Sequence, residues 1–101
     1  MRLNNNQAAA IKDTVVDIFG SGTQVFLFGS RVDDAGKGGD IDLLIVSTLP
    51  EKEALDRKIK VLSHLSFRLG EQKIDVITTA NAEGDQRLIV KEALKKGIRL
   101  L

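Results

Sequence analysis

Residues 28–46 read FGSRVDDAGKGGDIDLLIV, and this segment organises the rest of the chain. Residues 41–46 are apolar apart from Asp42, which predicts a strand buried on both faces of a sheet. Glycine and small polar residues fill positions 29–39 and indicate a turn or loop before this strand. Because side chains alternate along a strand, Asp40 and Asp42 point to the same face, about 6–7 Å apart.

The aspartate pair is unfavourable in a strand unless something compensates for it. Aspartate is depleted in strands, and two such charges repel each other by about 2–3 kcal/mol at an effective dielectric constant of about 20. A divalent cation such as Mg²⁺, which prefers carboxylate oxygens, would remove this repulsion. The alternative is that Asp40 merely begins the strand while Asp42 faces water at an open edge. The pair alone does not decide between the two.

A third aspartate and a Gly-Ser pair favour the metal-site interpretation. Asp75 lies in another apolar run, residues 73–78, and joins the first two acids if the two strands are neighbours. Three carboxylates on adjacent strands would form a two-metal site, whereas an edge position facing water is the alternative for Asp75. Gly29 and Ser30 directly follow a short apolar strand, residues 24–28, and their N–H groups and hydroxyl would form a phosphate-binding turn.

The remaining apolar residues predict an α/β fold, in which a small mixed β-sheet has helices packed on it. The predicted helices run from an asparagine cap at residues 4–6 to Gly20, from Pro50 to Gly70, and over residues 86–96. The predicted order is helix, strand, strand, helix, strand, helix. The long second helix favours a right-handed crossover between parallel strands, and the shorter link before it favours an antiparallel pair. We expect a single domain over residues 1–101.

Each of the three predicted helices carries an apolar stripe, and that of the first contains Ala8, Ile11, Val15 and Ile18. The stripe of the second helix contains Leu55, Ile59, Leu62, Leu65 and Leu69, and that of the last helix contains Ile89, Val90, Ala93 and Leu94. We expect Leu100 and Leu101 to be exposed after the last helix. Either the second helix or this C-terminal region would then dock a partner or form a homodimer.

Composition excludes several classes of site. The 15 Lys and Arg residues nearly balance the 14 Asp and Glu residues, so a net charge of +1 gives no general electrostatic case for a nucleic-acid or anionic-membrane binder. The absence of cysteine excludes disulfides, thiolate zinc sites and a cysteine nucleophile. No segment approaches the roughly 20 apolar residues that cross a bilayer, and the first residues lack the apolar region of a signal peptide. We therefore expect a cytoplasmic protein.

The motif combination resembles the DNA polymerase β-type nucleotidyltransferase superfamily. Gly29 and Ser30 are followed by nine residues, by Asp40 and Asp42 around one isoleucine, and by a later strand that carries Asp75. The chain length and the nine-residue gap are closest to the minimal nucleotidyltransferases, small subunits often paired with a helical partner of the HEPN type. The resemblance covers the whole chain and implies a fold like the palm of polymerase β.

This resemblance implies a role for each matching residue. Asp40 and Asp42 would hold two Mg²⁺ ions that bind the triphosphate of ATP. Asp75 would complete the metal site near the attacking hydroxyl and favour its deprotonation. Gly29 and Ser30 would hold the terminal phosphates. An acceptor hydroxyl would attack the α-phosphate and pyrophosphate would leave.

Other polar residues carry less specific signals. Arg31 would pair with a phosphate or face solvent in the turn. Lys37 would close over the nucleotide or remain a solvated loop lysine. Asp33 and Asp34 are expected to form turns. His64 is expected to be a packing or surface residue of the second helix.

The small size of the chain limits the reaction, because a template channel does not fit in 101 residues at net charge +1. The resemblance implies transfer of AMP to a tyrosine of a HEPN-type toxic ribonuclease, so that the chain acts as its antitoxin. One alternative is a binding subunit that neutralises its partner by contact alone. Another is the catalytic subunit of a two-chain enzyme whose acceptor is a small molecule.

Overall fold

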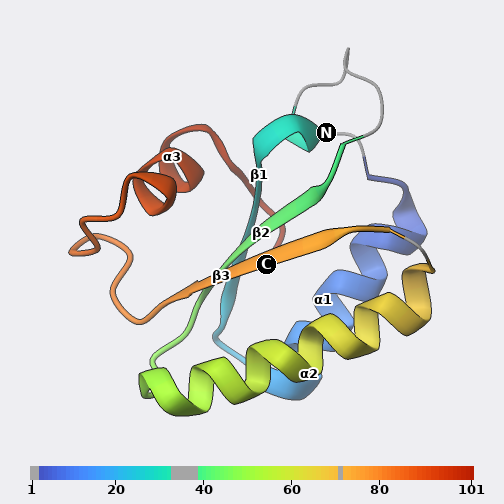
Figure 1. Ribbon diagram of the computed structural model, residues 1–101, viewed down its shortest axis with the longest axis horizontal. Coiled ribbons are helices and arrows are strands. Elements are labelled where there is room, and N and C mark those ends of the chain that lie inside the picture. Colours follow the sequence, from blue (N-terminus) through green and yellow to red (C-terminus); the bar gives the residue numbers. More distant parts are fainter. Residues whose placement is uncertain (1–2, 33–38, 71) are drawn as a thin grey trace.

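A four-stranded mixed sheet with helices on both faces forms the frame of the molecule (Figure 1). The computed structural model describes residues 3–32, 39–70 and 72–101. The elements in chain order are α1 (Asn5–Phe19), β1 (Gln24–Phe28), the 3₁₀ turn η1 (Gly29–Val32), β2 (Ile41–Val46), α2 (Glu51–Leu69), β3 (Ile74–Thr79), α3 (Leu88–Lys96) and β4 (Ile98–Arg99).

The strands lie in the order β3-β2-β1-β4. β1 pairs antiparallel with β2 and with β4, whereas β2 and β3 are parallel. The α/β class, the mixed sheet and both predicted strand pairings are therefore confirmed. The parallel pairing follows from α2, which returns the chain to the starting end of the sheet before β3 begins.

Local signals account for the start and end of α1. The Asn4 side chain accepts a hydrogen bond from the Gln7 backbone N–H at 2.8 Å, and the Gln7 side chain accepts one from the Asn4 backbone N–H at 3.0 Å. This reciprocal capping box satisfies two N–H groups that the helix cannot pair internally. Gly20 ends the helix with a positive φ of 101°.

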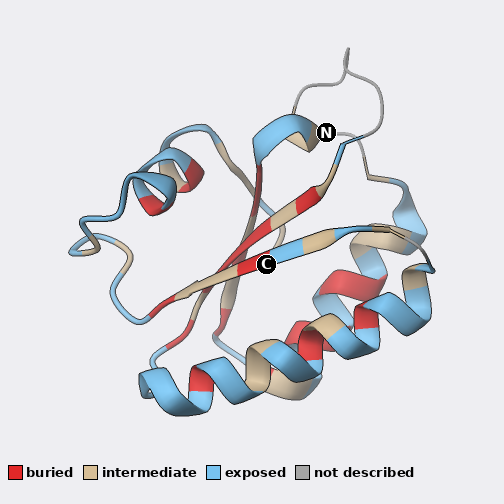
Figure 2. Ribbon diagram, in the orientation of Figure 1, coloured by how far each residue is buried: buried red, intermediate tan, exposed pale blue. Residues whose placement is uncertain are grey.

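The central strand β2 is covered on both faces, as predicted (Figure 2). Side chains facing α1 and α2 form the larger core cluster, which includes Val25, Leu27, Ile41, Leu43, Ile45, Val61, Leu65 and Val76. Side chains facing α3 form a smaller cluster of Phe28, Leu44, Val90 and Ala93. Since alternate residues share a face, Asp42 lies on the same side of β2 as Leu44 and α3.

The C-terminal residues differ from the sequence prediction, which missed β4 and placed Leu100 and Leu101 in solvent. Both leucines are half-buried against the larger core cluster. The Val25 N–H donates to the Leu101 carbonyl at 3.0 Å, and the Leu100 N–H donates to the Val25 carbonyl at 2.8 Å. After Gly97 the chain turns back and pairs with the edge of β1 opposite β2. This pairing buries the two leucine side chains. Three other bounds also shift: β3 runs from Ile74 to Thr79 instead of over residues 73–78, and α3 begins at Leu88.

The predicted stripe of α2 is only partly buried. Leu65 is buried and Leu62 and Leu69 are half-buried, whereas Leu55 is 54% exposed and Ile59 is 58% exposed. Two residues outside the predicted stripe, Ala54 and Val61, complete the buried line of the helix. At about 100° per residue, Leu55 and Ile59 lie to one side of the buried line, towards solvent. In the described part of the chain, no helix is long and apolar enough to cross a membrane.

Candidate active site

The strand register brings two of the predicted site aspartates side by side. Asp42 of β2 and Asp75 of β3 are direct register partners in the parallel pair. Phe28, the last residue of β1, is the register partner of Asp42 on the other side. Asp40 comes two residues before Asp42, where the chain enters β2. The prediction that these two strands are neighbours is confirmed, and a role for Asp75 depended on it.

Negative charge accumulates around Asp42. Burial raises the pKa of Asp42 above its ordinary value, and the charges of Asp75 and Asp40 raise it further. Lys73 opposes this increase, and its Nζ atom lies 3.5 Å from Oδ2 of Asp40. This ion pair is exposed to solvent, so it offsets only a small part of the repulsion.

The donor chemistry of this cluster suits a hard divalent cation, because Asp40, Asp42 and Asp75 offer only carboxylate oxygens. After burial, the charges of Asp75 and Asp40 are the causes that raise the pKa of Asp42, and such a cation would neutralise these charges. Within residues 3–32, 39–70 and 72–101, however, no three Asp, Glu, His or Cys side chains are arranged so that they could hold a metal ion as they stand. The metal-binding roles of the three aspartates therefore stay a prediction.

The Gly-Ser turn lies directly against the carboxylate of Asp42. Gly29 has a φ of +74°, which is unfavourable for any residue with a side chain. A Cβ atom at this position would overlap Oδ2 of Asp42. Two independent constraints therefore require glycine here. The exposed Ser30 follows it at the start of η1, beside the acidic cluster, as the phosphate-turn prediction needs.

Arg31 connects three segments at this end of the sheet. Its Nε donates to the Gly39 carbonyl at 3.2 Å, and its Nη2 donates to Oε1 of Gln72 at 3.0 Å. Gln72 in turn donates to the same Gly39 carbonyl at 3.4 Å. The contacts tie η1 to the chain that enters β2 and to the chain that enters β3. A phosphate-binding role for Arg31 stays a prediction, and nothing in the sequence pointed to Gln72.

A cavity of about 410 Å³ opens over the two paired aspartates. Its lining consists of Phe28, Asp42, Lys58, Leu62, Ile74, Asp75, Val76, Ile77 and Ile89. Lys58 and Leu62 come from α2, whereas Ile89 comes from α3, where it is 46% exposed rather than buried in the predicted stripe. Sequence reasoning missed Lys58 because a single lysine on a helix carries no local signal for a site.

The remaining predicted residues lie on α2 or outside the described part of the chain. His64 is exposed on α2, in agreement with a surface role. Lys37, Asp33 and Asp34 lie outside the described residues.

The comparison with known families decides the relationship. The family model described as "Polymerase beta, Nucleotidyltransferase" matches residues 13–101, which include every residue of the site described above. The chain belongs to the polymerase beta nucleotidyltransferase family. A comparison with curated protein sequences finds no match. Family and fold together assign the chain to nucleotidyl transfer.

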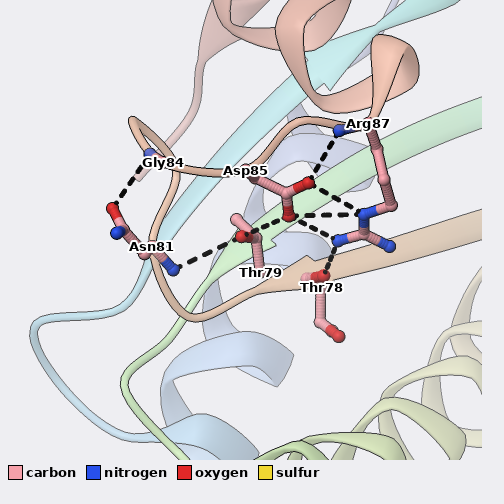
Figure 3. A network of polar contacts seen from close by, with 6 residues as sticks. All are labelled: Thr78, Thr79, Asn81, Gly84, Asp85 and Arg87. Atoms are coloured by element: carbon pink, nitrogen blue, oxygen red, sulfur yellow. Dashed lines mark hydrogen bonds and ion pairs between the residues drawn. The ribbon is translucent and has the colours of Figure 1, made fainter.

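A polar network fixes the loop that leads into α3 of this nucleotidyltransferase (Figure 3). Asp85 accepts hydrogen bonds from the Thr79 hydroxyl at 2.7 Å and from the Arg87 guanidinium, whose Nη2 lies 2.8 Å away. The same Arg87 Nη2 donates to the Thr78 carbonyl at 2.7 Å. Hydrogen bonds from Arg87 hold the pKa of Asp85 well below its usual range. The network fastens the start of α3 to the end of β3, and α3 contributes Ile89 to the cavity.

Asp85→Asn is expected to lower the Tm of the nucleotidyltransferase by a few degrees at pH 7. The pKa of Asp85 is lower in the folded state than its unfolded value of 3.8. The ionised carboxylate therefore contributes its full stabilisation of the fold above pH 3.8, and this contribution is lost as the pH falls below that value. The difference from wild type should therefore shrink in thermal melts towards pH 2. Asp56→Asn, which removes an exposed ion pair of 3.9 Å with Lys60, is the matched control and should leave the Tm unchanged. An unchanged Tm in Asp85→Asn at pH 7 would reject this role.

Proposed function

We propose that this nucleotidyltransferase moves AMP from ATP to an acceptor hydroxyl supplied by another molecule. One observation carries the proposal: Asp42 is flanked by Asp75 in strand register while the Gly29 backbone is packed against its carboxylate. A phosphate-binding turn and the acids that would face the reacting phosphorus are thereby next to each other. Burial and the charges of Asp75 and Asp40 raise the pKa of Asp42, so the ionised cluster is unfavourable for stability. A protein that only binds its partner would have no use for such a cluster.

Each residue then has a distinct task. Asp40 and Asp42 would hold Mg²⁺, which neutralises charge on the attacking and leaving oxygens when it is bound. Gly29 and Ser30 hold the terminal phosphates. Asp75 is exposed, and its carboxylate takes the proton of the acceptor hydroxyl. The hydroxyl oxygen forms a bond to the α-phosphorus, the bond from that phosphorus to the β-phosphate oxygen breaks, and pyrophosphate leaves.

The cavity beside Asp75 favours a protein side chain as the acceptor. Its walls are mainly apolar, with Phe28, Leu62, Ile77 and Ile89 around the two carboxylates. Such a lining suits an aromatic ring that carries a hydroxyl better than a strongly polar small molecule. We propose that the acceptor is a tyrosine of a HEPN-type toxin and that the chain is a minimal nucleotidyltransferase acting as its cytoplasmic antitoxin.

Intact-mass measurement of AMP transfer tests this function. Purified chain, ATP and Mg²⁺ are incubated with and without a co-encoded helical protein, and we expect one or more AMP additions on that protein. The same reaction with inorganic triphosphate in place of ATP is the chemical control and should give no adduct. Metal-dependent ATP binding without any protein adduct would move the acceptor to a small molecule. Neutralisation of the partner without ATP would instead indicate a binding subunit that acts by contact.

A further inference from the structure

A second cavity adjoins the cavity over Asp42 and Asp75. It has a volume of about 380 Å³ and is lined by Phe28, Gly29, Val32, Glu92 and Lys96. Phe28 lines both cavities, so the two are adjacent. Among the described lining residues, Lys96 carries the positive charge. The last turn of α3 therefore presents a cation to the turn at which the terminal phosphates are proposed to bind.

The position of Lys96 is set by the packing of α3. Val90 and Ala93 are buried against the sheet in the smaller core cluster. At Gly97 a Cβ atom would overlap the Ala93 carbonyl and lie 3.0 Å from the Leu27 carbonyl, so the helix ends directly against the last residues of β1. Because β1 continues into Gly29, the end of α3 is held beside the Gly-Ser turn.

The present partner of Lys96 is easily exchanged. Its Nζ lies 3.6 Å from Oε2 of Glu92, and both side chains are largely exposed, at 69% and 61%. Exposed pairs of this kind contribute little to stability. By contrast, Arg31, which the sequence suggested as a phosphate-binding residue, already donates hydrogen bonds to Gly39 and Gln72. Lys96 can therefore turn to a phosphate group without breaking contacts that hold the fold.

We propose that Lys96 binds the β- and γ-phosphates of the nucleotide, leaving Glu92 when a triphosphate arrives, and that Glu92 limits the affinity by competing for it. This inference rests on the proposed nucleotidyl transfer. In this proposal Lys96 contacts the polyphosphate part of the substrate and does not contact the nucleoside. Lys96 and Glu92 therefore have opposite effects on triphosphate binding.

Calorimetric titration of the full chain with ATP, AMP and inorganic triphosphate in the presence of Mg²⁺ tests the proposal. Lys96→Ala should weaken binding of ATP and of triphosphate by about tenfold and leave AMP binding unchanged. Glu92→Gln should tighten ATP binding by about threefold, because the competing carboxylate is neutralised. Lys96→Arg should recover most of the affinity, since arginine also pairs with phosphate.

Lys95→Ala is the matched control, because Lys95 is exposed on the same helical turn but is not among the described residues lining the cavity. It should bind ATP as the wild type does, and thermal melts should show the same Tm for both alanine variants. Wild-type affinity in Lys96→Ala, with ATP still bound, would overturn the role of Lys96 while leaving the proposed function intact. Equal weakening of AMP and ATP would also overturn it. Absence of ATP binding in the wild type would reject the proposed function itself.

Discussion

Asp42→Asn is expected to reduce nucleotide transfer by about a thousandfold or more while the chain stays folded. Asparagine keeps the shape of the side chain but removes the charge at the centre of the acidic cluster. Asp75 lies on the adjacent strand and Asp40 precedes β2, so neither carboxylate occupies the position of Asp42 between Phe28 and Asp75. Single-turnover assays with saturating ATP and partner protein would measure the loss. Retained transfer would reject the two-metal assignment, and loss of partner binding in this variant would point to a contact role.

The same variant is expected to be more stable than the wild type at neutral pH, by about 0.5 kcal/mol, the usual size for partly exposed charge pairs. Burial and the charges of Asp75 and Asp40 raise the pKa of Asp42, so the folded state binds its proton more tightly than the unfolded chain does. The ionised carboxylate therefore destabilises the fold as the pH rises above 3.8. Urea unfolding should show this gain at pH 7 and its disappearance below pH 3.8, where both variants are uncharged here. A lower stability at pH 7 would contradict the repulsion argument.

Gly29→Ala is expected to reduce nucleotide transfer about as much as Asp42→Asn does. It should also lower the free energy of unfolding. A left-handed φ costs about 1–2 kcal/mol for a residue with a Cβ atom, and Gly29 has a φ of +74°. In addition, the new methyl group would overlap Oδ2 of Asp42 and push this carboxylate out of line with Asp75. Transfer assays and chemical unfolding of the same preparation would separate the two effects.

Gly70→Ala is the matched control for this variant. Gly70 has nearly the same φ, +73°, but no described atom lies within 4 Å of a Cβ built there. Both alanine variants place a Cβ atom at a positive φ, and only Gly29→Ala displaces Asp42. We expect both to lose stability and only Gly29→Ala to lose transfer. Equal transfer in the two variants would show that the contact between the turn and Asp42 is unimportant for the reaction.

Local sequence signals were sufficient for most of the elements and for part of the site. The bounds of β1 and β2 agree with the apolar runs, since a buried strand needs apolar residues on its covered faces. The side-chain period of two also predicted Asp40 and Asp42 on one face, but β2 begins at Ile41, so the placement of Asp40 stays a prediction. The long second helix indicated that β2 and β3 are parallel, and the structure confirms that pairing.

Signals of this kind failed where burial depends on a distant segment. Leu100 and Leu101 follow a helix and a glycine, which looked like an exposed end, but they pack on the core because the chain pairs with the edge of β1 opposite β2. Leu55 and Ile59 have helical apolar spacing and are nevertheless largely exposed. Their exposure is set by which side of α2 meets the sheet, and periodicity does not contain that information.

The residue types and spacings alone were enough to single out the three aspartates and the Gly-Ser turn as site candidates and to predict the α/β class, because these follow from short-range geometry and side-chain chemistry. Only the tertiary structure decided that Asp42 lies beside Asp75 and against Gly29, that Gln72 accepts a hydrogen bond from Arg31, and that Lys96 lines the same cavity as Gly29. Lys96 is separated from Gly29 by more than half of the chain. Contacts at such separations arise from strand register and helix packing, and no local pattern encodes them.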